Sequence, residues 1–141
     1  MTPAREHALV TAIGSAILPG GASLPAFDSA SASRVLAHVA REGDVAQRAF
    51  QTFLASLDAT CRVRYARGLE RCTPEQRLRL LRFLDKGSAA TRLLSKFGLA
   101  PFKTLHLDDP RVYRSVGCQY RAASVKAEPK TAHTSPKSGP R

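Results

Sequence analysis

The side chains that could do chemistry are few in this chain and far apart. Its histidines stand at four separate places: His7, His38, His106 and His133. His106 stands near the chain's one pair of adjacent carboxylates, Asp108 and Asp109, and a carboxylate neighbour can orient a histidine as a general base. No serine or cysteine stands at a spacing that would make it the activated nucleophile of such a pair. Because Pro110 follows Asp109, the acidic pair is better explained as the cap of a helix that begins at the proline.

The cysteines do not predict a metal site. Cys61, Cys72 and Cys118 include no CxxC pair and have no histidine near them, so the spacings of zinc and iron–sulfur sites are absent. Cys61 lies on an apolar helical stripe and is expected to be a buried small hydrophobic residue. A Cys61–Cys72 disulfide would need an oxidising compartment, and the sequence leaves this pairing open. We therefore expect no catalytic residue, no metal and no cofactor in this chain. We also expect that the chain is not an enzyme by itself.

A strong positive charge is the most conspicuous feature of the composition. The formal net charge is +11, from 22 lysine and arginine residues against 11 acidic residues. The densest part is the Arg62–Arg82 stripe, in which Arg64, Arg67 and Arg71 are expected to share one face of a helix.

Three interpretations of this basic stripe remain open. It could be a solvated face whose arginine stems shield the helices beneath, a surface for an acidic protein, or a surface for nucleic-acid phosphates. Single-stranded nucleic acid is usually bound by cations interleaved with aromatic rings. Only Tyr65 is interleaved here, so nucleic acid is the weakest of the three.

The elements that must position all these residues are predicted to be helices. Apolar residues recur at every fourth position over 44–69, which is the period of an amphipathic helix. Thr73-Pro74-Glu75-Gln76 is a capping box with proline at the first helical position, and it predicts a leucine-rich helix that runs to Leu84. A further helix is expected to end at Gly98, and a separate short one to start at Pro101.

The remaining segments complete an all-α prediction. Further helices are expected after Pro3, after Asp28 and after Asp109, and no segment has the alternation of a strand. The fold class is thus all-α, a small irregular helical bundle of about five to six helices. We assign one domain to residues 1–121 and expect 122–141, which is rich in Lys, Pro, Ser and Thr, to be a disordered basic tail.

No signal for a compartment is visible in the sequence. No segment reaches the roughly 18–20 apolar residues that span a bilayer, and the N-terminus has neither a secretory nor a twin-arginine signal. We therefore expect a cytoplasmic location, or a periplasmic one if a partner protein carries the chain during export.

The order of these features resembles the gluconate 2-dehydrogenase subunit 3 family, small helical accessory subunits of flavin-dependent dehydrogenases of the glucose–methanol–choline type. The matching segments are Ile17-Leu18-Pro19-Gly20, Phe50–Asp58, Thr73–Leu78 and the ending from Tyr113 to Gly117. The resemblance covers roughly Ala8 to Tyr120. Two departures concern the missing export signal, which many members carry, and Cys118, where an aromatic residue is expected.

The resemblance implies a non-catalytic small subunit. Such a subunit would bind and stabilise, and help to mature or export, a large FAD-dependent subunit that oxidises sugars, polyols or other alcohols. FAD would lie in that partner, and a cytochrome subunit or another acceptor would take the electrons. The alternative function is a small basic nucleic-acid-binding protein that uses the Arg62–Arg82 stripe.

The apolar loop 18–27, which has no clear periodicity, and the late segment 101–120 are the predicted contacts with the partner. Aromatic anchors usually dominate the energy of an interface. The candidate contact residues are Leu24, Phe27, Phe102, Tyr113 and Tyr120. The competing interpretation is that these side chains close the core of the bundle itself, and for Phe102 the two interpretations are equally supported. The interface interpretation predicts that Phe27→Asp abolishes the complex without unfolding the bundle.

Overall fold

The computed structural model describes residues 1–21 and 24–115, and within these ranges every regular element is helical. The elements are α1 (Pro3–Ile17), α2 (Ser29–Arg41), α3 (Asp44–Tyr65), the 3-10 turn η1 (Leu69–Arg71), α4 (Pro74–Asp85), α5 (Ala89–Leu107) and α6 (Pro110–Ser115). The prediction of an all-α bundle of five to six helices is confirmed. The predicted tail 122–141 lies outside the described residues.

Several helices begin where the sequence predicts. Asp28 caps α2, because its carboxylate accepts a hydrogen bond from the Ser31 N–H at 2.8 Å. Thr73 and Gln76 form the complete capping box of α4, each side chain accepting from the other residue's backbone N–H. Pro74 and Pro3 occupy first-turn positions, where a missing N–H costs nothing.

The long helix α3 ends at Tyr65, four residues before the predicted end. Ala66 has φ 54° and lies in the left-handed region, which stops the helix. The Asp58 carboxylate then accepts the Leu69 N–H at 2.9 Å, and this bond turns the chain back against α3. Sequence periodicity missed this ending because Leu69 continues the apolar pattern while belonging to η1.

Helix α5 runs without a break through the two residues that were expected to divide it. Gly98 is buried in mid-helix, and a Cβ there would overlap the ring of Phe53. The glycine therefore serves close packing of α5 on α3 and not helix termination. Pro101 removes only one helical hydrogen bond, and continuing the helix places Phe102 in the core, where it is fully buried.

Gly98→Ala tests this close approach. Alanine favours a helix over glycine by about 1 kcal/mol, yet overpacking a tight core costs roughly 1–3 kcal/mol or more. We expect urea denaturation to show a net loss of stability, whereas Gly21→Ala, with no atom near the added Cβ, should change little. A Gly98→Ala protein more stable than wild type would contradict the packing argument.

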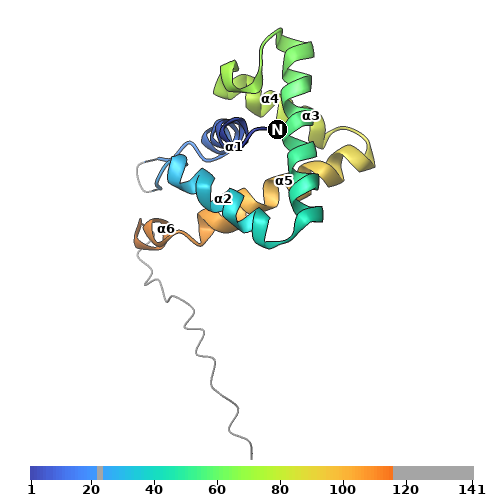
Figure 1. The fold of residues 1–141 in the computed structure, drawn as a ribbon. Coiled ribbons are helices and arrows are strands. Elements are labelled where there is room, and N and C mark those ends of the chain that lie inside the picture. Colours follow the sequence, from blue (N-terminus) through green and yellow to red (C-terminus); the bar gives the residue numbers. More distant parts are fainter. Residues whose placement is uncertain (22–23, 116–141) are drawn as a thin grey trace, which may run out of the picture.

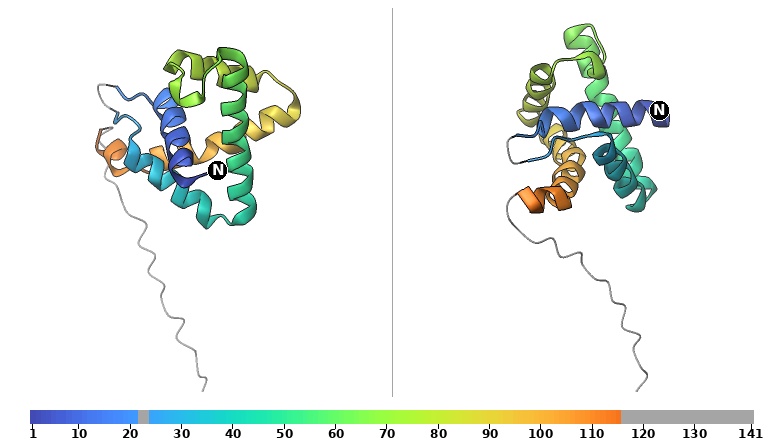
Figure 2. Two further views of the ribbon diagram at one scale, coloured as in Figure 1. Left: turned by 45° about the horizontal axis from the view of Figure 1, so that its top comes forward. Right: turned by 90° about the vertical axis from the view of Figure 1, so that its left-hand side faces the viewer.

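Helix α1 lies across the bundle and contacts α2, α3, α4 and η1, while α5 packs against α2, α3 and α4 (Figures 1 and 2). Four aromatic rings fill the space between these helices: Phe27, Phe50, Phe53 and Phe102. Phe27 packs on Gly14 of α1 and lies 5.7 Å from the ring of Phe102, centroid to centroid. The loop after α1 therefore supplies a core residue.

The burial of two residues corrects the prediction that they contact a partner. Phe27 is 6% exposed and Phe102 is fully buried, so neither is available to a partner on the surface of this chain. Both close the bundle's own core, which is the competing interpretation of their sequence pattern. Among the described helices, none combines the length and the apolarity that crossing a bilayer requires.

Candidate partner-binding groove

An open apolar groove of about 610 Å³ lies along α5, facing the end of α2 and the start of α3. The nearly buried ring of Phe50 and the backbone of Gly98 contribute to its lining, and Leu93 and Phe97 line it from α5. Because three helices from distant parts of the sequence contribute, the groove exists only in the folded chain.

The groove is bordered by large apolar side chains that the chain leaves in water. Leu93 is 56% exposed and Phe97 is 69% exposed, and both lie four residues apart on the same face of α5. Leu107, at 65% exposure, lies farther along the same helix. Two large apolar residues beside an apolar groove form a patch typical of an interaction site.

Cations run along one side of this exposed face. Arg92, Lys96 and Lys103 of α5 are all exposed, and within the described part of the chain none of them forms an ion pair. Helical spacing places them beside the Leu93–Phe97 stripe. The opposite wall is mixed, with His38 Nε2 lying 3.9 Å from the Glu42 carboxylate. The groove thus has an apolar centre and one carboxylate, Glu42, in its lining. The three cations of α5 lie beside the lining, and we call them the basic edge of the groove.

Sequence reasoning missed the groove. Leu93, Leu94 and Phe97 read as the apolar stripe of a helix, but periodicity does not say whether that stripe faces the chain's own core or a partner. Leu94 is partly buried against the core, while its neighbours Leu93 and Phe97 are exposed. The signal in the sequence was the width of this apolar stripe, which is greater than packing against the core alone requires.

Neither Leu24 nor Tyr113, two further predicted contact residues, lines this groove. Leu24 is 43% exposed in the loop after α1, and Tyr113 is half-buried on α6. Tyr120 lies outside the described residues. Of the five predicted contact residues, the structure brings Phe27 and Phe102 together, and it does so in the core.

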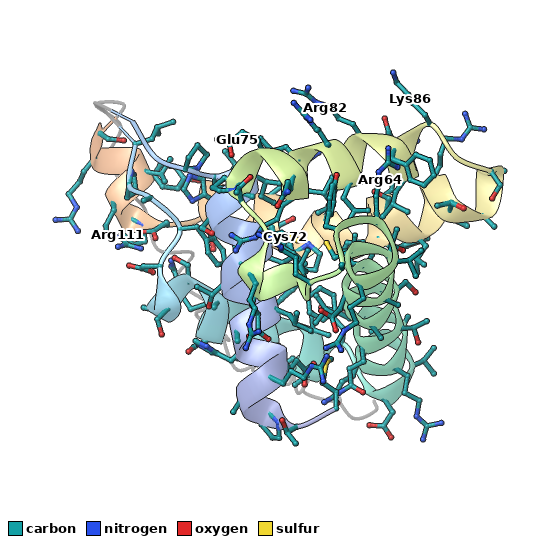
Figure 3. All side chains as sticks on the ribbon, turned by 90° about the horizontal axis from the view of Figure 1, so that it is seen from above. Arg64, Cys72, Glu75, Arg82, Lys86 and Arg111 are labelled. Atoms are coloured by element: carbon teal, nitrogen blue, oxygen red, sulfur yellow. The ribbon has the colours of Figure 1, made fainter. Side chains whose placement is uncertain are left out.

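The fold divides the basic stripe in part, although Arg67 and Arg71 still line one cleft. Arg64 lies on α3, Arg67 in the following loop and Arg71 on η1, so they do not share a helical face as predicted. The guanidinium of Arg64 lies 4.9 Å from the ring centroid of Phe83, a cation–π contact. Arg82 projects outward from α4 (Figure 3).

One arginine of the predicted run has a structural task. Arg77 donates hydrogen bonds to the carbonyl oxygens of Ala12, Leu69 and Glu70, at 2.8 to 3.0 Å. These three bonds tie α4 to α1 and to η1. Desolvation by burial lowers the pKa of this guanidinium. Arg77 is therefore a cross-link of the fold and no part of a free basic surface.

The family model for gluconate 2-dehydrogenase subunit 3 matches residues 4–127, which is most of the 141-residue chain. The chain belongs to the gluconate 2-dehydrogenase subunit 3 family. The resemblance found in the sequence is confirmed. No curated protein and no solved structure matches the chain. Members of this family are accessory subunits of a dehydrogenase complex, which gives the exposed groove a context.

In this subunit 3 chain, buried carboxylates hold distant segments together. Asp109 is 2% exposed and accepts hydrogen bonds from the guanidinium groups of Arg34 on α2 and Arg111 on α6. Arg111 also donates to Asp28 at 2.8 Å. The bonds from Arg111 hold the pKa of both Asp109 and Asp28 well below the usual range. This network fastens α6 to the start of α2.

A second network joins α1 to the end of α3. Burial by itself raises the pKa of Asp58, but hydrogen bonds from the Leu69 N–H, Arg5 and Arg62 together outweigh it and lower the pKa. Both arginines line a neighbouring cleft of about 830 Å³ together with Arg67 and Arg71, so that four arginines there stand against two carboxylates, Asp58 and Glu70.

These carboxylates predict a loss of stability in acid. Their pKa values are lower in the folded chain than the unfolded value of about 3.9, so their contribution is fully present above that pH and is lost as the pH falls below it. We expect a nearly constant urea midpoint from pH 7 to pH 5 and a falling one below about pH 4. Asp109→Asn should be less stable at pH 7 and should lose less of its remaining stability between pH 5 and pH 3. An equal acid loss in that variant would contradict the role given to Asp109.

The cysteines of the described region are free thiols. Cys61 and Cys72 are both buried and unpaired by a disulfide in this structure. Burial, with the neighbouring Cys72, raises the pKa of Cys61 to about 12, which keeps it protonated and unreactive at neutral pH. Cys118 lies outside the described residues. Within those residues no group of His, Cys, Asp and Glu side chains is arranged to hold a metal ion.

Proposed function

We propose that this chain is a non-catalytic subunit that binds and stabilises the FAD-dependent catalytic subunit of a dehydrogenase acting on sugars, polyols or other alcohols. Membership of the gluconate 2-dehydrogenase subunit 3 family supports this role. FAD belongs to the partner in this proposal, and the electrons leave the partner through a cytochrome subunit or another acceptor. The proposal extends to help with maturation or export of the partner.

The observation that carries the proposal is the exposed apolar stripe on α5. Burying apolar surface stabilises a protein by about 25 cal/mol per Å². Leu93 and Phe97 are mostly exposed in the free chain, so much of this stabilisation is absent there. In the same part of the chain, Phe50 and Phe102 are buried in the core, so α5 has one face in the core and one in water. A binding partner would recover the missing burial.

Co-production tests the proposal. The tagged chain is purified together with the flavoprotein subunit from its native host, and the absorption spectrum of the eluate is recorded. We expect flavin bands with wild type, none or few with Phe97→Asp, and wild-type bands with Val63→Asp, which alters an 89% exposed apolar residue of α3. An eluate without flavin from the wild-type chain would contradict the proposed function.

The alternative, nucleic-acid binding, receives less support from the fold. Arg64, Arg67 and Arg71 share no helix, although Arg67 and Arg71 line one cleft together with Arg5 and Arg62. Affinity for nucleic acid would fall steeply with added salt. Lack of binding at low salt would remove this alternative.

A further inference from the structure

The groove along α5 has the features of a docking site for a helix. We infer that it takes an amphipathic helix of the catalytic subunit, one that places large apolar side chains in the groove and carboxylates along its basic edge. This inference rests on the proposed function and names the chemistry of the partner segment at the same site.

The backbone of this chain favours helix-in-groove recognition. A partner strand would need an exposed sheet edge with unpaired backbone groups, and the described residues contain no strand. The lining of the groove on α5 extends from Ala90 to Thr104, about 20 Å at 1.5 Å per residue. That length matches roughly four turns of a partner helix. Leu93 and Phe97, one turn apart, would then contact apolar residues at i and i+3 or i+4 of that helix.

The charge along the groove specifies the polar face of the partner. Arg92, Lys96 and Lys103 are exposed on α5 and have no carboxylate partner in the described residues. Lys96 and Lys103 are separated by two helical turns, so carboxylates with the same spacing on a neighbouring helix would lie opposite them. Complementary charges of this kind fix the register of a contact and speed association.

The same charges argue against the two occupants that this chain could itself supply. In a two-fold contact between copies, α5 would meet α5 and the same cations would approach each other, which is repulsive. The C-terminal segment 122–141 contains four lysine and arginine residues and a single carboxylate. It therefore carries the same sign of charge as the groove edge. An acidic helix from a different protein fits best.

A pair of charge reversals with a matched control tests the inference. Lys96→Glu with Lys103→Glu reverses two charges at the groove edge. Arg79→Glu with Arg82→Glu reverses two charges on α4, outside the groove lining, and changes the net charge equally. Each variant is titrated against the purified flavoprotein subunit at low and high salt, and circular dichroism verifies that each is folded.

We expect the groove reversal to weaken binding at least about tenfold at low salt, equivalent to 1.4 kcal/mol, and the difference to shrink at high salt. The α4 reversal should stay within about twofold of wild type. Phe97→Ala should weaken binding by about 30-fold at either salt concentration, as expected of an aromatic anchor.

Each other outcome overturns the inference in a recognisable way. Equal weakening by both reversals would indicate a general charge effect, and weakening by the α4 reversal alone would move the interface to α4. Unchanged binding by the variant with Lys96→Glu and Lys103→Glu would rule out an acidic helix as the occupant of the groove. The proposed function would still stand. Failure of the wild-type chain to bind the flavoprotein would remove both. A free wild-type dimer that Phe97→Ala dissociates would identify a second copy as the occupant.

Discussion

Phe27→Asp is expected to unfold the bundle, the largest effect of any single substitution considered. The ring of Phe27 packs directly on the Cα of Gly14 and against Phe102, and only 6% of the residue is exposed. Truncating a buried phenylalanine costs about 3–5 kcal/mol, and an unpaired carboxylate in the same place adds a desolvation cost. A loss above about 5 kcal/mol approaches the whole stability of a typical domain. This result would be the opposite of the sequence-based expectation for Phe27→Asp.

Leu24→Asp is the matched control for that experiment. Leu24 lies three residues earlier in the same loop and is 43% exposed, so the new carboxylate can remain in water. Far-UV circular dichroism should show wild-type helicity for Leu24→Asp and lost helicity for Phe27→Asp. A cooperative urea transition near the wild-type midpoint in Phe27→Asp would show that this ring is not part of the core.

Phe102→Ala is expected to lower the free energy of unfolding by about 3–5 kcal/mol. Phe102 is fully buried and lies 5.7 Å from the ring of Phe27 and 6.1 Å from that of Phe50, centroid to centroid. Removing the ring would leave a cavity at the junction of α3, α5 and the loop after α1. Partial collapse of the neighbouring rings would bring the cost toward the lower value.

Phe97→Ala provides the comparison within the same helix. Phe97 is the same residue type, lies five positions earlier on α5 and is 69% exposed. Its truncation should change the urea midpoint little, because little burial is lost in the free chain. Equal destabilisation by the two variants would contradict the division of α5 into a core face and a partner face. The order of the two variants should reverse for binding: Phe97→Ala should weaken the affinity for the partner more than Phe102→Ala does.

These experiments separate folding from assembly. Core residues such as Phe102 act on the stability of the chain alone, whereas groove residues such as Leu93 and Phe97 act on the affinity for a partner. The proposed role as an accessory subunit requires both classes of residue. Only the second class distinguishes an accessory subunit from any other small helical bundle.

Local signals in the sequence determined the helices and most of their starts. The Thr73–Gln76 capping box, the cap at Asp28 and the four-residue apolar period of α3 are interactions within one or two turns, so they can be predicted from neighbouring residues. The order of these features also indicated the family, which the match over residues 4–127 confirms.

Only the tertiary structure decided which apolar residues face the core and which face outward. Gly98 does not end a helix. It lies in mid-helix, where the ring of Phe53 on α3 occupies the space that a side chain at residue 98 would need. Phe27 is buried because Gly14, thirteen positions away, leaves room for its ring. The groove of α5 arises where three helices meet. Periodicity along one helix reports that a face is apolar, but what covers that face depends on contacts between residues far apart in the chain.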